Sequence, residues 1–278
     1  MIELSKRLER HRVLPLTREP RFSDRLVGRV GCGVPMKCPV CGCFSLAERF
    51  ADNLRESGNC AKCGATNRQR QLALVILRCL LPGRVVGTGL VAVSAGRERI
   101  FNTEAAGPVH RALAASPNYV CSEYVGQGYR PGDDVEGTRH EDLQELSFAD
   151  ASIDVVISSD VLEHVPDPYQ AHREIFRVLD ARGVHVFTVP FLASEEFDQH
   201  RSCLTPDGNV VHLLEPQYHD DPLRKGGALV YTLFGLEMLV ELAKIGFRTN
   251  VYNVRSVCHG IYGHNALVFV AQKPQSSE

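Results

Sequence analysis

Residues 157–190, ISSDVLEHVPDPYQAHREIFRVLDARGVHVFTVP, decide the fold of this chain. Their pattern predicts a strand, a turn, a helix, a second turn and a second strand. The strand begins earlier, because IDVVISS (153–159) is an apolar run of strand length. Residues 169–179 follow with apolar side chains on one helical face, and VHVFTVP (184–190) closes the unit. A strand, a helix and a strand in this order are typical of a parallel sheet.

The same alternation extends over the body of the chain. Further strands are predicted at 89–95, 118–124, 141–148, 249–256 and 264–273, and further helices at 103–115 and 235–247. This alternation predicts an α/β fold with a doubly wound, mostly parallel, seven-stranded Rossmann-like sheet. In such sheets, ligands bind at the carboxyl ends of the strands.

Length and composition indicate a globular protein. The 278 residues are 44% hydrophobic and 23% charged, which is ordinary for a chain that buries a core. No apolar run approaches the roughly 20 residues of a membrane span, so we expect no membrane partner. The first residues, MIELSKRLERHRV, lack the apolar region of a signal peptide. We therefore expect a cytoplasmic protein.

Six of the ten cysteines crowd into residues 32–63. CPVCG and CAKCG place Cys38 with Cys41 and Cys60 with Cys63 in two Cys-x-x-Cys-Gly motifs. A two-residue spacer lets both thiolates of a motif face one ion, and the glycine permits the tight turn. Two such motifs predict a four-thiolate, structural Zn²⁺ site. Cys32 and Cys43 flank the first motif and are alternative ligands.

These patterns divide the chain. We expect a helical or extended arm at 1–30, a zinc-ribbon-like module at 31–66, and a connecting helix at 67–84 that Asn67 or Thr66 caps. Residues 85–278 form the α/β domain, with a lid insertion at 191–230. Connections as long as this lid are often functional.

The charge is unevenly distributed. Residues 1–84 carry 16 Lys and Arg against 7 Asp and Glu, although the whole chain has a net charge of −2. A basic N-terminal part can contact nucleic acid. The other interpretation is that the basic part packs against the acidic body, and the scattered basic residues favour it.

Residues 141–190 resemble the class I S-adenosylmethionine-dependent methyltransferases. The resemblance rests on SFADASIDVVISSDVLEHVPDP, the helix AHREIFRVL and the strand VHVFTVP, and it extends less specifically over 85–272. It implies a cofactor with a sulfonium, an adenosine and an amino-acid end.

The resemblance also implies which residues contact that cofactor. Glu123, next to Tyr124, would bind the ribose diol at the end of the second strand, and Asp142, followed by Leu143, would accept from the adenine amino group. The backbone of Ser94, Ala95 and Gly96 would hold the amino-acid end. The remaining contacts would come from Ser159, Asp160 and His164 after the fourth strand.

One loop departs from the family pattern. Where the family shows an acidic residue and several glycines, VAVSAGRERI offers only Gly96. Fewer glycines leave fewer positions where the backbone can approach a ligand closely. A non-catalytic, methyltransferase-like binding protein therefore stays open as an alternative.

The acids and histidines of the quoted turn and of the lid are the remaining candidates for chemistry. Asp160 is a candidate helix N-cap, and we expect Glu163 to bond backbone N–H groups in the turn. In the lid, Tyr218, His219 and Asp220 form a candidate general base, an imidazole whose ring a carboxylate orients. His200 and Arg201 follow as catalytic candidates, Arg201 as a clamp for an anionic acceptor.

Together these features predict a zinc-containing methyltransferase. We expect S-adenosylmethionine as cofactor and methyl transfer to a small-molecule acceptor, first to oxygen as hydroxyl or carboxylate. The alternative enzyme is an RNA methyltransferase in which the basic zinc module binds phosphates. A homodimer is one possible assembly.

Overall fold

The computed structural model describes residues 13–14, 33–81, 88–219, 226–263 and 267–275. The predicted arm at 1–30, apart from Val13 and Leu14, and Cys32 lie outside the described residues. No helix in these described ranges has both the length and the apolar character that a bilayer crossing requires.

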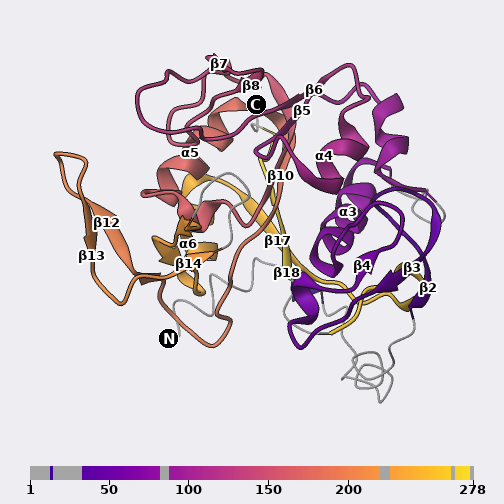
Figure 1. Ribbon diagram of the computed structural model, residues 1–278. Helices are drawn as coiled ribbons and strands as arrows, with labels where there is room; N and C mark the ends of the chain where they lie inside the picture. The colour runs from indigo at the N-terminus through magenta and orange to yellow at the C-terminus, as the bar shows by residue number, and fades with distance from the viewer. Residues whose placement is uncertain (1–12, 15–32, 82–87, 220–225, 264–266, 276–278) are drawn as a thin grey trace.

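A seven-stranded mixed sheet forms the centre of the molecule (Figure 1). Its strands run in the order β6-β5-β9-β10-β18-β17-β1, in which β18 is antiparallel to both of its neighbours. The strands are β1 (Val13–Leu14), β5 (Ile100–Asn102), β6 (Tyr119–Cys121), β9 (Ile153–Ser159), β10 (Leu179–Thr188), β17 (Arg248–Asn253) and β18 (Leu267–Gln272). The expected doubly wound, mostly parallel sheet is confirmed.

The sheet has the predicted number of strands, seven, but not all of them are the strands that the sequence predicts. Residues 90–95 form a 3-10 helix, η2 (Leu90–Ala95), and the predicted strand there is wrong. The first parallel strand is β5, which begins at Ile100. The predicted strand at 141–148 is replaced by a single parallel bridge between Glu123 and His140, and β1 takes the seventh place.

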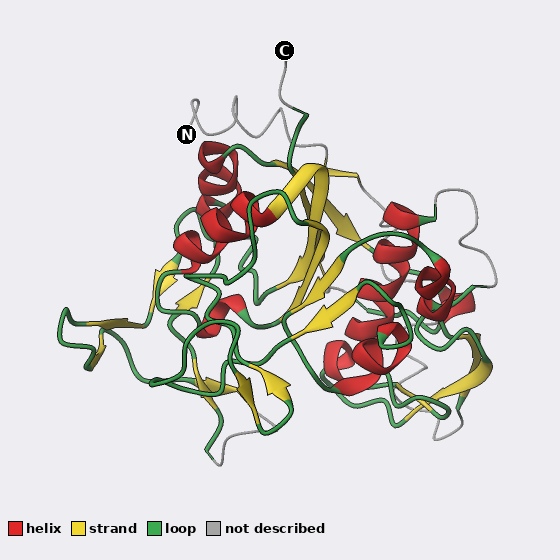
Figure 2. Ribbon diagram, turned by 90° about the horizontal axis from the view of Figure 1, so that it is seen from above, coloured by secondary structure: helices red, strands yellow, loops and turns green. Residues whose placement is uncertain are grey.

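Helices cover both faces of the sheet (Figures 1 and 2). The helices α3 (Asn67–Leu80) and α4 (Gly107–Leu113) lie on one face, and α5 (Pro168–Val178) and α6 (Glu237–Ile245) lie on the other. Side chains alternate along each strand. Consequently Val155 and Ile157 belong to the core under α3, while Val156 belongs to the core under α5.

The zinc-ribbon-like module is a small three-stranded sheet. It contains β2 (Val34–Lys37), β3 (Phe44–Glu48) and β4 (Asn59–Cys60), with a 3-10 turn, η1 (Leu54–Glu56), between β3 and β4. Its buried residues Met36, Val40 and Ala47 belong to the same apolar cluster as α3 and the sheet. The module and the α/β body therefore share one hydrophobic core.

Two hydrogen-bonded features fix α3 between module and sheet. Thr66 and Gln69 form a capping box at its start, as one of the two predicted caps requires. Arg70 is fully buried and donates to the carbonyl oxygens of Ala65, at 2.5 Å, and Gly260, at 2.7 Å. The second contact ties the helix to a segment near the end of the chain.

The lid is built from short paired strands. These are β11 (Gln199–His200) with β16 (Thr232–Leu233), β12 (Ser202–Leu204) with β13 (Val210–His212), and β14 (Tyr218–His219) with β15 (Ala228–Leu229). The β12–β13 hairpin projects from the body (Figure 1). Two further short strands, β7 (Asp134–Val135) and β8 (Thr138–Arg139), form a hairpin after β6, and a 3-10 turn, η4 (Val257–His259), follows β17.

Candidate active site

Three parallel strands end together at one edge of the sheet. Asn102 at the end of β5 is paired with Cys121 of β6 and with Ile157 of β9. The residues that follow these strands, beginning at Thr103, Ser122 and Asp160, therefore meet at this carboxyl edge. Polar side chains here have the position in which such sheets bind ligands.

The loop after the first parallel strand is 103–107, with the sequence TEAAG. The predicted loop of Ser94, Ala95 and Gly96 instead precedes β5 and adjoins the zinc module. Leu90, at the start of η2, donates its backbone N–H to the carbonyl oxygen of Pro39 at 3.0 Å. The cofactor contact assigned to these three residues therefore does not fit, because they stand before the strand and its ligand edge follows it.

Two glutamates lie at the loop 103–107. Glu123, directly beyond β6, accepts the backbone N–H of Ala105 through Oε1 at 2.8 Å. Glu104 lies within the loop, and burial raises the pKa of its carboxyl to about 7, with the charge of Arg68 opposing this shift. Gly107 has a φ of +84°, and a Cβ there would meet only the Gln69 side chain, at 3.9 Å. Small side chains and open space leave the loop backbone approachable.

The residues predicted around the adenine lie beyond the bridge between Glu123 and His140. Asp142 accepts the backbone N–H of Gln144 at 2.8 Å in a tight turn. Leu143 is buried in the core under α5, and Tyr124 is 42% exposed with its ring 5.3 Å from that of His140. The structure thus brings Glu123, Tyr124 and Asp142 to the same part of the edge.

Asp160 connects this edge to the zinc module. Arg55 of η1 donates two hydrogen bonds to its carboxylate, at 2.5 and 2.6 Å, and Arg68 of α3 lies 3.4 Å away. Thr188 also donates to it, at 2.8 Å. Burial opposes ionisation, but the charges of Arg68 and Arg55 lower the pKa of Asp160 to about 2. Ser159, beside it, is hydrogen-bonded to Arg68.

The predicted N-cap role of Asp160 is wrong. The turn that follows β9 is a 3-10 helix, η3 (Leu162–His164), whose N-cap is Val161 without a side-chain hydrogen bond. Asp160 has a φ of +56°, which turns the chain sharply at the end of β9. Its carboxylate instead pairs with Arg55 of the module and Arg68 of α3. The local sequence does not reveal these partners.

Glu163 is fully buried, and among the described residues neither of its carboxylate oxygens makes a hydrogen bond. The expected bonds to backbone N–H groups are therefore absent from this part of the chain. Two imidazoles face Oε1 instead, with His219 Nδ1 at 3.5 Å and His164 Nε2 at 3.7 Å. Burial raises the pKa of Glu163, and its carboxylate raises the pKa of His219.

The structure separates the four catalytic candidates of the lid. His219 faces Glu163, whereas Asp220, the carboxylate predicted to orient this histidine, lies outside the described residues. His200 contacts Thr232 Oγ1 at 3.2 Å, and Arg201 donates to the carbonyl oxygen of Glu215 at 2.6 Å within the lid. Tyr218 is 54% exposed.

A group of tyrosines links the lid to the cofactor side of the edge. Burial raises the pKa of Tyr231, and its neighbours Tyr124 and Tyr218 raise it further. Tyr231 also donates its backbone N–H to the carbonyl oxygen of Glu163 at 2.7 Å. The lid is therefore attached to the turn after β9, and its aromatic side chains approach Tyr124.

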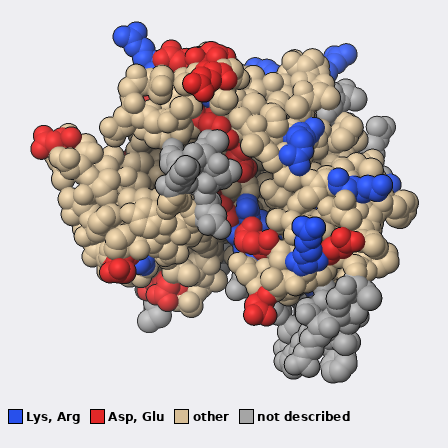
Figure 3. Space-filling view, in the orientation of Figure 1, with Lys and Arg blue, Asp and Glu red and all other residues tan. Residues whose placement is uncertain are grey.

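Charged side chains gather where these parts meet. Figure 3 shows acidic and basic side chains along a furrow between the half that holds the zinc module and the half that holds the lid. The partners of Arg55 and Arg68 in this region are Asp160 and Glu56. The arginines that border the edge are thus engaged within the molecule.

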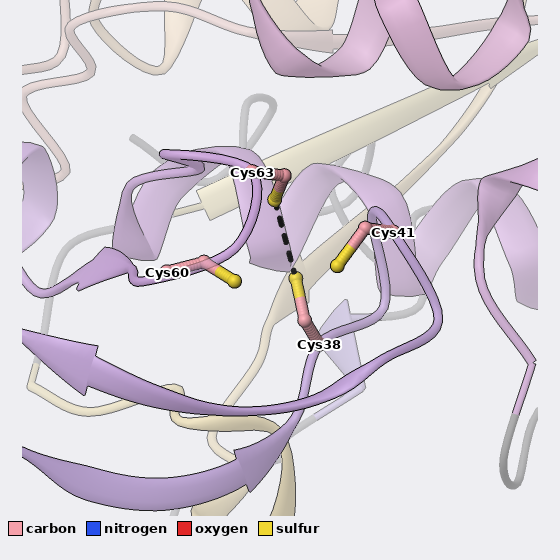
Figure 4. A group of neighbouring side chains, drawn as sticks. All are labelled: Cys38, Cys41, Cys60 and Cys63. Atoms are coloured by element: carbon pink, nitrogen blue, oxygen red, sulfur yellow. Dashed lines mark hydrogen bonds between the residues drawn. The ribbon is translucent and has the colours of Figure 1, made fainter.

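The four predicted cysteine ligands converge (Figure 4). The sulfur atoms of Cys38, Cys41, Cys60 and Cys63 lie within 4.8 Å of one another, and Cys38 and Cys63 are 3.8 Å apart. Four Zn–S bonds of about 2.3 Å at tetrahedral angles give sulfur separations of about 3.8 Å. Gly42 and Gly64 have φ values of +71° and +79°, as the tight turns require.

The protonation of these thiols is coupled. The hydrogen bond with Cys38 lowers the pKa of Cys63 to about 5, and burial raises the pKa of Cys41 to about 12. The buried group thus holds a thiolate close to thiols that burial keeps protonated, and a divalent cation would allow all of them to ionise. Geometry and donor set both fit a structural zinc ion.

Comparisons with known proteins found methyltransferases. A family model described as a methyltransferase domain matches residues 110–187. A probable S-adenosylmethionine-dependent methyltransferase of Mycolicibacterium smegmatis is 46% identical over 52 residues, which are 19% of this chain and 20% of that protein. An uncharacterized methyltransferase of Mycobacterium sp. strain KMS is 49% identical over 43 residues, 16% of this chain and 17% of its own. The chain therefore matches about a fifth of the length of these curated relatives.

Solved structures of the same description are also similar. A methyltransferase from Mesorhizobium loti has a TM-score of 0.44 at 17% identity, covering 75% of this chain and 98% of that one. One from Listeria monocytogenes has a TM-score of 0.43 at 12% identity, covering 75% and 99%. The family model over 110–187 and the curated relatives agree with the resemblance at 141–190, and together they support a class I S-adenosylmethionine-dependent methyltransferase.

Proposed function

We propose that this protein transfers a methyl group from S-adenosylmethionine to an oxygen atom of a small molecule. One observation carries the proposal: the glutamates of the cofactor side, Glu104 and Glu123, and the Glu163–His219 pair of the lid side lie at one carboxyl edge. When bound, the cofactor supplies an electrophilic methyl group on a sulfonium. The protein then has to position an acceptor in line with it.

The residues at the edge fit the cofactor. In the proposal Glu123 binds the ribose diol, because a carboxylate can accept from both hydroxyl groups. The backbone of 103–107 takes the amino-acid end in place of Ser94–Gly96, and Glu104 provides a carboxylate near the ammonium group. Asp142 and Leu143 keep their predicted place beside the adenine.

Several features support a small oxygen acceptor. The lid is bonded to the turn after β9, so in the proposal the acceptor binds on the lid side of the edge, near Tyr124, Tyr218 and the Glu163 group. A hydroxyl acceptor must lose its proton, and the Glu163–His164–His219 group is the place for this step. A carboxylate acceptor would need no base.

The alternative of an RNA substrate is less well supported by the module. Arg55 and Arg68 are 18% and 14% exposed, and both bond to Asp160 or Glu56. Arginines that are engaged in this way do not present free charge to phosphates. The basic excess of the N-terminal part is thus used at least partly inside the molecule, as the packing interpretation expects.

We also infer that Cys38, Cys41, Cys60 and Cys63 bind one structural Zn²⁺. Such a site is coordinatively closed, so it stabilises the module and takes no part in methyl transfer. Metal analysis of the purified chain should find zinc in the wild type and lose it in Cys60→Ser, while Cys43→Ser, outside the group, retains it.

Calorimetric titration with S-adenosylmethionine tests the cofactor assignment. We expect a dissociation constant near the micromolar range. Glu123→Ala should weaken binding about 10- to 100-fold, because hydrogen bonds to a charged group contribute about 1.5–3 kcal/mol. Glu241→Gln, on the outer surface of α6, is the matched control and should bind as the wild type does. Unchanged affinity in Glu123→Ala would refute the ribose assignment.

The acceptor class needs a second measurement. Formation of S-adenosylhomocysteine should depend on a small hydroxylated or carboxylated compound when a panel of such acceptors is supplied. Turnover that instead requires RNA, with binding that weakens steeply as salt rises, would favour the RNA alternative. Failure to bind the cofactor at all would favour the alternative of a non-catalytic, methyltransferase-like binding protein.

A further inference from the structure

The buried carboxylate of Glu163 is the least explained group at the site. Its side chain is fully buried, and its oxygens lack hydrogen bonds among the described residues. A buried ionised carboxylate without compensation is costly, so native proteins pair such groups or use them as metal ligands. The position of Glu163, one residue before His164 and opposite His219, points to the second use.

The distances distinguish an ion pair from a metal site. A charge-assisted hydrogen bond brings nitrogen and oxygen to about 2.7–2.9 Å. Glu163 Oε1 is 3.5 Å from His219 Nδ1 and 3.7 Å from His164 Nε2, too far for such bonds. Ligand bonds of about 2.0–2.2 Å at tetrahedral angles separate the ligand atoms by about 3.3–3.6 Å. One ligand atom from each of the three residues lies within 4.8 Å of the others.

The hydrogen-bond partners of His164 and His219 determine which ring nitrogen can bind a metal ion. His164 Nδ1 lies 2.8 Å from the carbonyl oxygen of Leu229, which can only accept, so the proton is on Nδ1 and the lone pair is on Nε2. His219 Nε2 lies 3.2 Å from the amide nitrogen of Gln217, which can only donate. Metal binding through Nδ1 therefore requires the Gln217 amide to be flipped, so that its oxygen accepts from Nε2–H. In both rings the nitrogen that faces Glu163 is then the unprotonated one, as metal ligation requires.

Independent elements hold the three ligands in place. Glu163 and His164 come from η3, which the left-handed Asp160 places directly after β9. His219 comes from the lid, where β14 pairs it with Ala228 of β15. A hydrogen bond from Tyr231 N–H to the carbonyl oxygen of Glu163 joins lid and turn. The ligand set therefore does not depend on one flexible loop.

We propose that Glu163, His164 and His219 bind one divalent first-row transition-metal ion, separate from the zinc of the four cysteines. Two imidazoles and one carboxylate suit ions from Mn²⁺ to Zn²⁺. Three protein ligands leave at least one position open, as in catalytic rather than structural metal sites.

The open position assigns a role to the ion, and this step rests on the proposed function. An oxygen of the acceptor that binds the ion becomes more acidic, as metal-bound water does. Its O–H bond breaks with the proton passing to water, an O–CH₃ bond forms, and the S–CH₃ bond breaks with its electron pair remaining on sulfur. The products are a methyl ether or ester and S-adenosylhomocysteine.

Titration of the full zinc-loaded chain with Mn²⁺ tests the site without cofactor or acceptor. Free Mn²⁺ has an electron paramagnetic resonance signal that is lost on binding, and Mn²⁺ does not compete well for a thiolate site. We expect one Mn²⁺ per chain. Glu163→Gln and His219→Ala should each weaken binding by more than about 10-fold, since loss of an outer-shell partner alone costs 10- to 100-fold.

The controls distinguish a loss of metal binding from a loss of folding and from a lack of methyl transfer. His212→Ala changes a lid histidine outside the group and should bind Mn²⁺ as the wild type does. Zinc content and thermal unfolding report whether each variant is folded, and Glu163→Gln preserves the side-chain volume. A wild type that binds no Mn²⁺, or a folded Glu163→Gln variant with undiminished affinity, overturns the proposal. Mn²⁺ binding without methyl transfer to any acceptor would instead contradict the proposed function.

Discussion

Asp160 shows how one side chain can couple two parts of a molecule. Its carboxylate ends a strand of the sheet, and its two hydrogen bonds from Arg55 come from the zinc module. Asp160 and Arg55 are only 16% and 18% exposed. Loss of one charge from such a pair leaves the other charge without compensation in a partly buried position.

Asp160→Asn should therefore destabilise the fold strongly. Breaking a buried ion pair costs about 3–5 kcal/mol, and we expect the lower end because the pair retains some solvent contact. Denaturant unfolding at pH 7 measures the change. Asp150→Asn is the control, because its pair with Arg177 is 78% exposed on the aspartate side and exposed pairs contribute about 0–1 kcal/mol.

The same pair predicts a dependence on pH. Asp160 has a pKa of about 2 in the fold, below its ordinary value of 3.8, so its contribution is complete above that ordinary value. The contribution is lost as the pH falls from about 4 through about 2. The stability difference between wild type and Asp160→Asn should thus be constant from pH 7 to pH 5 and shrink toward pH 3. A constant difference at pH 3 would contradict the assigned pKa.

At the scale of elements, the first zinc motif and the start of η2 are in close backbone contact. Gly89 stands where η2 begins, and a Cβ on it would lie 2.3 Å from the backbone nitrogen of Gly42. Backbone atoms of the zinc motif cannot move aside without changing the metal site. A side chain at this position would force the two segments apart.

Gly89→Ala should destabilise the protein by about 1–3 kcal/mol, the usual cost of overpacking. It should also speed the release of zinc to a chelator, because the first motif has to shift. Gly96→Ala is the matched control, since the closest atom there is the end of the flexible Glu98 side chain. Equal unfolding midpoints for the two variants would show that the contact is unimportant.

Much of the fold was predictable from elements with clear periodicity. Strand β9 has the predicted bounds, α5 differs by one residue at each end, and the cysteine spacing identified all four members of the sulfur group. The first parallel strand was missed because β5 has only three residues, while the longer apolar run at 89–95 packs as a 3-10 helix on the zinc module. Strand propensity alone does not show which of the two segments forms the strand, because tertiary packing decides it.

The candidate site was also only partly predictable from the sequence. The cofactor roles of Glu123 and Asp142 stay predictions that the family resemblance implies. The partners of Asp160 and Glu163 were not found, because Arg55 and His219 are distant in sequence and reach the edge through the module and the lid. Spacing within one segment contains no information about such contacts. A small-residue stretch before a helix, TEAAGP at 103–108, was the available signal for the loop that our proposal assigns to the cofactor.

At the scale of the whole molecule, the module and the body share one core. Met36, Cys38 and Val40 pack in the same cluster as Leu72 of α3 and Val268 of β18. A module with this arrangement cannot lose its structure without exposing apolar surface of the body. The metal of the cysteines should therefore control the stability of the entire chain.

Removal of that zinc should lower the unfolding temperature in a single transition. In a chain of this size each kcal/mol lost corresponds to about 2–4 °C, so a loss of several kcal/mol is readily measured. Differential scanning calorimetry with and without a strong chelator makes the comparison, and Cys60→Ser should reproduce the effect while Cys43→Ser should not. Two separate transitions, with the second unchanged, would show that the module unfolds independently.

The contacts of α3 have a consequence for synthesis. Asn67 donates to the carbonyl oxygen of Tyr262 and accepts its backbone N–H, and Arg70 donates to Gly260, across 195 and 190 residues. During translation these polar groups exist long before their partners leave the ribosome. Contacts of such high sequence separation form late and slow the folding of a domain. The nascent chain would thus hold an assembled metal module whose supporting helix stays incompletely bonded until nearly all of the protein has been made.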